Sequence, residues 1–237
     1  MSEKEEIIHQ SKWATTVRVG KRIKKYYLYD NPEKISKETE LLRLSSNLPV
    51  SLIFDEQRHQ WVQEMPYISN TELFAGDSLH ILERLKDMVS LWDSDGRFLS
   101  LVSDNWEAKA KPYWKNVLET YGGTAAAVCY LSKTSGEHFI HGDFQIMNVL
   151  RNPLDELIVI DFENAGVGPE LWDETTMVYS LVQERKYALA KQAYSYFRCD
   201  KQMLECIAAI RLAQAKKKDV GIEKREYALT YVMENFD

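Results

Sequence analysis

The chain has 237 residues, of which 45% are hydrophobic and 28% charged, and its formal net charge is −6. A chain of this size and composition can bury a core, either as one domain or as two small lobes. The negative charge argues against nucleic acid as the main partner, and no apolar run approaches the ~20 residues of a membrane span.

The N-terminal residues and the cysteines predict the cellular compartment. The opening MSEKEEIIHQ lacks the apolar segment of a signal peptide. The three cysteines, Cys129, Cys199 and Cys206, are scattered along the chain and show no metal-binding spacing. Because such thiols are typical of reduced proteins, we expect a cytoplasmic protein.

Residues 6–30 alternate in polarity, which predicts the first strands of an antiparallel sheet. Gly20-Lys21 offers a turn between two of these strands. Alternation places the following residues on one face of each strand: Thr15, Val17 and Val19, then Ile23, Lys25 and Tyr27. No glycine-rich phosphate loop of the GxGxxG kind is present.

The segment Asn31-Pro32-Glu33 predicts the start of a helix that runs to about Ser46. Asparagine can cap the first turn, proline is favoured at the first helical position, and an acid suits the positive end of the helix dipole. Glu38 and Glu40 could form only a solvated face with neighbouring lysines.

Two more strands are predicted at residues 49–55 and 60–65, around the turn EQRH. From Asp77 the apolar period becomes helical, and residues 93–104 predict a loop. Further helices are expected at about 111–121, at 124–132 and after Asp173; the apolar positions that begin the helical region are Leu79, Leu82, Leu85 and Trp92.

Residues 141–165, HGDFQIMNVLRNPLDELIVIDFENA, carry the chemistry. Met147 to Leu150 and the run LIVI predict two strands of a hairpin, which would bring Asn148 and Asp161 side by side, with Asp143 just upstream. Magnesium prefers a few protein oxygens completed by water and phosphate. Asp143 is left to accept a proton from a hydroxyl, as in a phosphoryl transferase.

The pattern His141, Asp143, Asn148, Asp161 resembles the catalytic and metal motifs of the aminoglycoside phosphotransferase and choline kinase family. That resemblance implies an α+β, two-lobed protein-kinase-like fold. A small N-terminal lobe with an antiparallel sheet and one helix, residues 1–66, would bind nucleotide. A larger, mostly helical C-terminal lobe, residues 67–237, would hold the catalytic and substrate sites.

The resemblance also implies roles for the motif residues. Asp143 would be the base that orients the acceptor hydroxyl, and His141 would hold the catalytic loop through hydrogen bonds rather than react. Asn148 and Asp161 would bind Mg²⁺. Glu163 would bind a second magnesium or face the acceptor, and sharing a face with Asp161 requires that the extended backbone continue.

The family uses a strand lysine to hold the nucleotide phosphates and a helix glutamate to pair with it. Lys25 is favoured over Lys24, because Lys25 shares its face with the apolar Ile23 whereas Lys24 is expected to be solvated. The helix register favours Glu38, with Glu40 as the alternative. The residues expected to border the adenine, largely through backbone groups, are Glu64, Met65 and Tyr67.

The sequence thus predicts a phosphotransferase that uses ATP and Mg²⁺ to phosphorylate a hydroxyl of a small molecule. The alternatives are a catalytically weak or inactive nucleotide-binding module and a protein kinase, although the latter lacks its glycine loop. The string IDFENA resembles choline and ethanolamine kinases, for which acids and the aromatic residues Trp172, Tyr179 and Tyr194 would suit a cationic acceptor. The C-terminal helices are short for the family, so the acceptor and the oligomeric state stay open.

Overall fold

The computed structural model describes residues 4–102 and 137–236. The chain divides into two compact units, and neither is continuous in sequence. Unit 1 contains Met1–Leu73 and Asn148–Glu163, whereas unit 2 contains Phe74–Met147 and Asn164–Asp237. The helices expected at about 111–121 and 124–132, and with them Cys129, lie outside the described residues.

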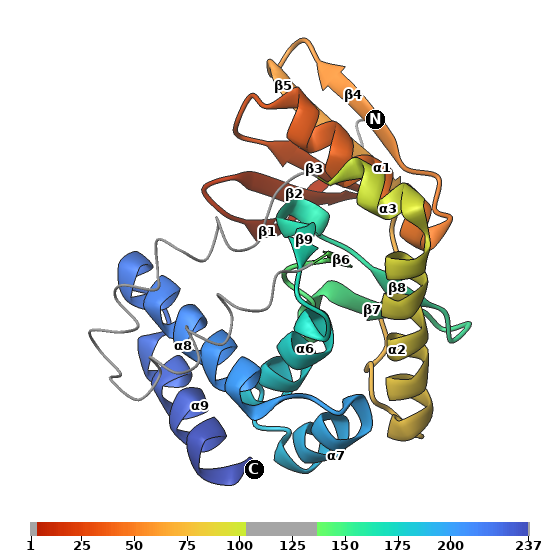
Figure 1. Cartoon of the computed structure of the whole chain (residues 1–237). Coiled ribbons are helices and arrows are strands. Elements are labelled where there is room, and N and C mark those ends of the chain that lie inside the picture. The colour runs from red at the N-terminus through yellow and green to blue at the C-terminus, as the bar shows by residue number, and fades with distance from the viewer. Residues whose placement is uncertain (1–3, 103–136, 237) are drawn as a thin grey trace. The chain divides into compact units, whose positions relative to one another are not determined.

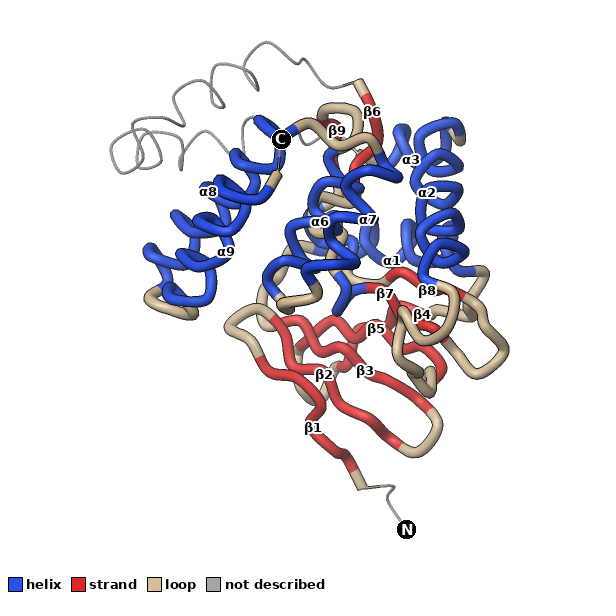
Figure 2. The backbone as a smooth tube through the Cα atoms, turned by 90° about the horizontal axis from the view of Figure 1, so that it is seen from below, coloured by secondary structure: helices blue, strands red, loops and turns tan. Residues whose placement is uncertain are grey.

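Unit 1 is built on a five-stranded antiparallel sheet with the strand order β1-β2-β3-β5-β4 (Figures 1 and 2). One helix, α1 (Pro32–Ser46), accompanies the sheet, and the Asn31 side chain accepts a hydrogen bond from the backbone N–H of Lys34, as the capping signal predicted. The strands are β1 (Glu5–Gln10), β2 (Ala14–Val19), β3 (Arg22–Tyr27), β4 (Ser51–Asp55) and β5 (Gln60–Pro66).

The register of the sheet separates its two faces. Lys25 lies opposite Gln63 of β5, and the Gln63 amide donates to the Thr39 hydroxyl of α1 at 2.9 Å, so this face looks toward the helix. The opposite face carries a small apolar cluster of Val17, Tyr26 and Val62. Adjacent residues of β3 therefore project into different surroundings.

The hairpin of β7 (Val149–Arg151) and β8 (Leu157–Val159) completes unit 1. All three residues of β8 are buried, and this strand packs against α1. The strand predicted from Met147 begins later, because Ile146–Asn148 forms a 3-10 turn.

Unit 2 is mainly helical within its described residues. Residues 93–104, predicted as a loop, instead contain a helix from Gly96 to Leu101, because the Asp95 side chain caps the Arg97 backbone N–H. The elements are α2 (Ser78–Ser94), α3 (Gly96–Leu101), β6 (His138–Ile140), β9 (Gly166–Gly168), α6 (Trp172–Gln183), α7 (Tyr187–Phe197), α8 (Lys201–Lys218) and α9 (Ile222–Asn235).

Trp92 of α2 organises an aromatic core in unit 2. Its ring lies 5.7–6.1 Å from the rings of Phe98, Phe139 and Phe144, and all four side chains are buried. Leu79, expected in the same apolar stripe, is 47% exposed, because its position on α2 faces solvent.

The cysteines and the lengths of the helices bear on two further expectations. Cys199 and Cys206 are free thiols, as predicted, and both are buried. None of the helices in the described part of the chain is long and apolar enough to cross a membrane.

Candidate active site

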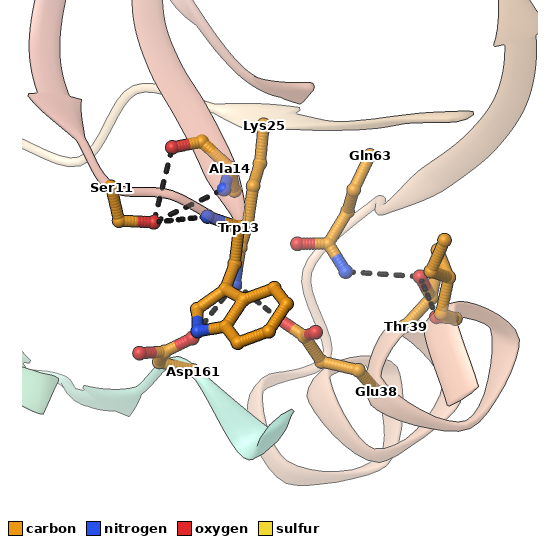
Figure 3. A network of polar contacts seen from close by, with 9 residues as sticks. Ser11, Trp13, Ala14, Lys25, Glu38, Thr39, Gln63 and Asp161 are labelled. Carbon is orange, nitrogen blue, oxygen red and sulfur yellow. Dashed lines mark hydrogen bonds and ion pairs between the residues drawn. The ribbon is translucent and has the colours of Figure 1, made fainter. Parts of the chain in front are cut away.

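A partly buried ion triad lies in unit 1 (Figure 3). The Lys25 ammonium contacts Glu38 Oε1 at 2.7 Å and Asp161 Oδ1 at 2.7 Å. The three residues come from β3, α1 and the end of β8, so folding of unit 1 is what assembles them. The structure thus joins Lys25 to Glu38, as the helix register predicted, while Glu40 pairs with Arg43.

In the triad, burial and the neighbouring charges act on the pKa values in opposite directions. Burial alone would lower the pKa of Lys25, but the carboxylates of Glu38 and Asp161 outweigh it and raise that pKa. Burial raises the pKa of Glu38, and the Lys25 ammonium opposes the change. Lys25 is therefore a permanent cation fixed between two carboxyl groups.

Lys24, the neighbouring lysine, has a different environment. Its ammonium lies 3.6 Å from Glu64 on the opposite face of the sheet, and Arg22 also pairs with Glu64. Lys24, which was expected to be solvated, is 28% exposed at its side chain and lies beside a carboxylate on the next strand.

The segment predicted to border the adenine follows β5. Glu64 is 8% exposed, and its carboxylate is taken up by Arg22 and Lys24. The Tyr67 backbone N–H donates to the Lys21 carbonyl at 2.8 Å, and its ring lies under the Arg18 guanidinium. For Glu64, Met65 and Tyr67, contact with a nucleotide base stays a prediction.

Asp161 stands where the chain leaves β8, in the left-handed backbone region with φ 68°. This conformation is uncommon for residues other than glycine, and the chain leaves the extended direction of β8 here. The Asn148 carbonyl accepts the Ile160 backbone N–H at 2.9 Å, so the hairpin brings Asn148 next to the residue that precedes Asp161.

Glu163 does not continue an extended strand, because Phe162–Asn164 is a 3-10 turn, so the condition for a shared face with Asp161 is not met. Burial nevertheless raises the pKa of Glu163, and the negative charge of Asp161 raises it further. Crowded carboxylates of this kind are relieved by a cation.

The donor set fits a hard divalent ion. Asn148, Asp161 and Glu163 offer only oxygen ligands, and Mg²⁺ takes one or two carboxylates plus phosphate and water. Within residues 4–102 and 137–236, no group of three or more His, Cys, Asp and Glu side chains could hold a metal unaided. These residues would therefore share such an ion with a phosphate ligand.

In unit 2 the Asp173 carboxylate holds the backbone of the catalytic loop. Asp173, 1% exposed, accepts the backbone N–H groups of His141 at 2.6 Å and Gly142 at 3.1 Å. Burial raises the pKa of Asp173 to about 8, although the two backbone donors act in the opposite direction. Asp173 thus fixes the loop through two backbone hydrogen bonds.

His141 is fully buried and stacks on Trp92 with ring centroids 6.2 Å apart. Its Nδ1 accepts the Asp143 backbone N–H at 3.3 Å. Both contacts hold the loop, which supports the structural interpretation of His141 over a chemical one.

The Asp143 carboxylate accepts hydrogen bonds from Gln145 and Arg211. The Gln145 amide donates to Oδ1, and Arg211 Nη2 donates to the same oxygen at 2.5 Å. Burial by itself would raise the pKa of Asp143, but Arg211, Gln145 and His141 reverse the effect, so the pKa is lowered. Asp143 is consequently an ionised carboxylate with a fixed orientation.

The contact of Arg211 with Asp143 was not predicted from the sequence. Arg211 belongs to α8 and carries no motif, but it lies between Ile210 and Leu212, which are 5% and 0% exposed. An arginine between two apolar residues of a buried helix is a usable signal, because a buried charge needs a partner.

A family model described as "Phosphotransferase enzyme family" matches residues 79–205, more than half of the chain. The chain therefore belongs to the phosphotransferase enzyme family. It is a small-molecule kinase, a phosphotransferase with an alcohol group as acceptor, as the motifs predicted.

Solved structures share the fold over nearly the whole chain. The GDP complex of wild-type aminoglycoside 2'-phosphotransferase-IIIa is 12% identical, with a TM-score of 0.70 over 99% of this chain and 94% of that one. Choline kinase LicA from Streptococcus pneumoniae is 16% identical, with a TM-score of 0.61 over 98% and 94%. Amicoumacin kinase hAmiN is 12% identical, with a TM-score of 0.63 over 97% and 87%.

These likenesses confirm the α+β, protein-kinase-like fold that the motifs implied. No curated protein matches the chain in sequence.

Proposed function

We propose that this enzyme transfers the γ-phosphoryl group of ATP, with Mg²⁺, to a hydroxyl group of a small molecule. The observation that carries the proposal is the Lys25–Glu38–Asp161 triad, in which a permanent cation lies 2.7 Å from each of two carboxylates. A lysine held in this way offers a phosphate-binding charge, and Asp161 offers an oxygen for a divalent ion.

In this proposal unit 1 binds the nucleotide. Lys25 holds the phosphates, Glu38 fixes the Lys25 ammonium, and Glu64, Met65 and Tyr67 border the base. Asn148, Asp161 and Glu163 hold the divalent ion, which neutralises phosphate charge when bound. The proposed nucleotide-binding lobe comprises residues 1–66. The hairpin of β7 and β8 contributes the proposed metal ligands to the same unit.

The residues of unit 2 align the acceptor. Asp143, kept ionised and oriented by its donors, accepts a hydrogen bond from the attacking hydroxyl and takes up its proton. The bond between the γ-phosphorus and the β,γ-bridging oxygen breaks, a bond from the acceptor oxygen to phosphorus forms, and ADP leaves. Alignment does most of the work in so loose a transition state, so a carboxylate of low pKa suffices.

The ligands bound in the similar structures support nucleotide use without fixing the donor. The aminoglycoside 2'-phosphotransferase structure is a GDP complex, LicA has been solved with AMP, and hAmiN with AMP-PNP and Ca²⁺. ATP and GTP should therefore be compared as donors with each of Mg²⁺ and Ca²⁺.

Two substitutions test the proposal. Asp143→Asn should bind nucleotide with unchanged affinity in calorimetry but lose nearly all transfer, because only the aligning carboxylate is removed. Asp161→Ala should lose Mg²⁺-dependent nucleotide binding. Near-normal transfer rates in Asp143→Asn, measured with radiolabelled ATP over a panel of alcohols, would contradict the role given to Asp143.

A further inference from the structure

Arg211 is a partly buried cation placed directly against the catalytic loop. Its Nη2 donates to Asp143 Oδ1 at 2.5 Å and to the Gly142 carbonyl at 3.3 Å. The residue comes from α8, beyond the segment 79–205 that matches the family model. Arg211 therefore lies outside the matched segment, whereas its partners Asp143 and Gly142 lie inside it.

The guanidinium of Arg211 is only partly used. Both of its hydrogen bonds leave from Nη2, while Nε and Nη1 donate to no residue that the structure describes. The side chain is 18% exposed, so it is neither sealed in the core nor free in solvent. Since a guanidinium carries five N–H donors in a planar fork, an edge of Arg211 remains for a ligand.

Tyr179 is a buried polar neighbour on which the charges of Arg211 and Arg225 both act. Tyr179 of α6 is 1% exposed, and its hydroxyl makes no hydrogen bond to any described residue. Burial raises the pKa of Tyr179 to about 12, and the charges of Arg211 and Arg225 oppose that rise. Arg225 anchors the loop after α8 by donating to the Val220 and Gly221 carbonyls at 3.2 Å.

The negative groups at the loop are already engaged. Asp143 is paired with Arg211, and Asp173 is taken up by the His141 and Gly142 backbone N–H groups. A cationic acceptor would have to compete with Arg211 for Asp143, whereas an anionic group on the acceptor would meet unused donors.

We propose that Arg211 binds an oxyanion of the acceptor, so that the preferred substrate is a small alcohol that also carries a carboxylate or a phosphate. The inference rests on the proposed function, since it names the acceptor class of the same transfer reaction. Because Arg211 and the attacking hydroxyl both contact Asp143, the oxyanion and the hydroxyl are separated by few bonds. Purely cationic alcohols such as choline are disfavoured.

Matched pairs of acceptors that differ by one anionic group test this inference. Serine is compared with ethanolamine, homoserine with 3-aminopropanol, glycerate with ethylene glycol, and glycerol 3-phosphate with glycerol. The anionic member should have a KM at least about tenfold lower, the size expected for a charge-assisted hydrogen bond. Serine, homoserine and glycerate report on a carboxylate, and glycerol 3-phosphate reports on a phosphate.

Substitution of Arg211 identifies the cause of the preference. Arg211→Gln should abolish it, and Arg211→Lys should retain part of it, because lysine keeps the charge but loses the fork. Arg97→Gln is the matched control, since Arg97 is a 70% exposed arginine of the same unit and pairs with Asp95. Circular dichroism and melting temperature establish that each variant is folded.

Three results would overturn the inference. The neutral or cationic member of each pair could be as good as the anionic one, the preference could survive in Arg211→Gln, or Arg211→Gln could lower kcat for all acceptors with unchanged KM ratios. The last result would mean that Arg211 only positions Asp143.

Transfer to none of these alcohols would count against the proposed function, and binding then decides the inference separately. Calorimetric titration with glycerate and with glycerol 3-phosphate should show binding to the wild-type protein that is lost in Arg211→Gln. Absent binding, or equal binding to both proteins, would overturn it.

Discussion

Lys24 and Lys25 contact different carboxylates because successive residues of a strand alternate between its two faces. Lys25 reaches Glu38 and Asp161, whereas Lys24 reaches Glu64 on the other face. Loss of the Lys25 charge would leave the carboxylates of Glu38 and Asp161 close together without the cation that they share.

Lys25→Met should therefore raise the KM for ATP at least about tenfold and destabilise the fold by about 3–5 kcal/mol, the range for breaking a buried ion pair. Lys24→Met, one residue away, should change both quantities little. Steady-state kinetics and urea unfolding measure the two effects, and similar behaviour of the two variants would disprove the assignment.

The pH profile should report the environment of Asp143. With its pKa lowered, Asp143 stays ionised down to acid pH, so the wild-type profile of kcat/KM should show no limb from this group above its ordinary pKa of 3.8. In Arg211→Gln the raising effect of burial is no longer offset by Arg211, and only His141 and Gln145 still oppose it. An acid limb should then appear at higher pH; an unmoved profile would count against this electrostatic account.

At the scale of the element, the catalytic loop depends on one glycine. Gly142 has φ +79°, and a Cβ built there would lie 2.4 Å from the Asn164 carbonyl oxygen. Both the left-handed conformation and the contact with backbone exclude a side chain.

Gly142→Ala should cost more than the roughly 1–2 kcal/mol of a left-handed alanine, because the clash with backbone adds to it. It should also lower kcat, since the clash displaces the loop that carries Asp143. Gly96→Ala is the control: a Cβ there meets nothing within 4 Å, so that variant should keep wild-type stability and rates. Thermal unfolding and acceptor kinetics decide between these outcomes.

The sequence predicted the elements whose signals are local. The cap at Asn31 and the helical period after Asp77 both correspond to real helix starts. The hairpin of β7 and β8 was also predicted, but its edges were not: the 3-10 turns on both sides of it depend on tertiary contacts such as that of the Ile146 N–H with the Ser180 hydroxyl.

The partners of the charged residues were harder to predict than the motif. Glu38 could be matched to Lys25 because the helix register restricts the choice. Arg211 could not be matched to Asp143, since 68 residues separate them and no local pattern encodes that contact. Long-range ion pairs are fixed by packing, which a single sequence does not display.

For the whole molecule, ligand binding and stability are coupled. A ligand that binds only the folded protein adds about 2.7 kcal/mol of stability at 100 times its dissociation constant. AMP-PNP with Mg²⁺ should therefore raise the melting temperature by several degrees, and either component alone should raise it less.

Asp161→Ala should remove the joint effect of AMP-PNP and Mg²⁺, whereas Asp143→Asn should preserve it. Differential scanning fluorimetry measures these shifts. An equal shift from AMP-PNP with and without Mg²⁺ would mean that nucleotide binding does not require the metal.

The discontinuity of unit 1 has a consequence for how the protein is made. The strand β8, which packs on α1, is encoded about 110 residues after that helix ends. On the ribosome the nascent sheet and α1 must wait for residue 159 to emerge before the buried side of the helix is covered, leaving a window in which chaperones can bind. A recombinant fragment ending at Leu73 should aggregate, whereas one with Asn148–Glu163 fused through a flexible linker should be recoverable as a folded product.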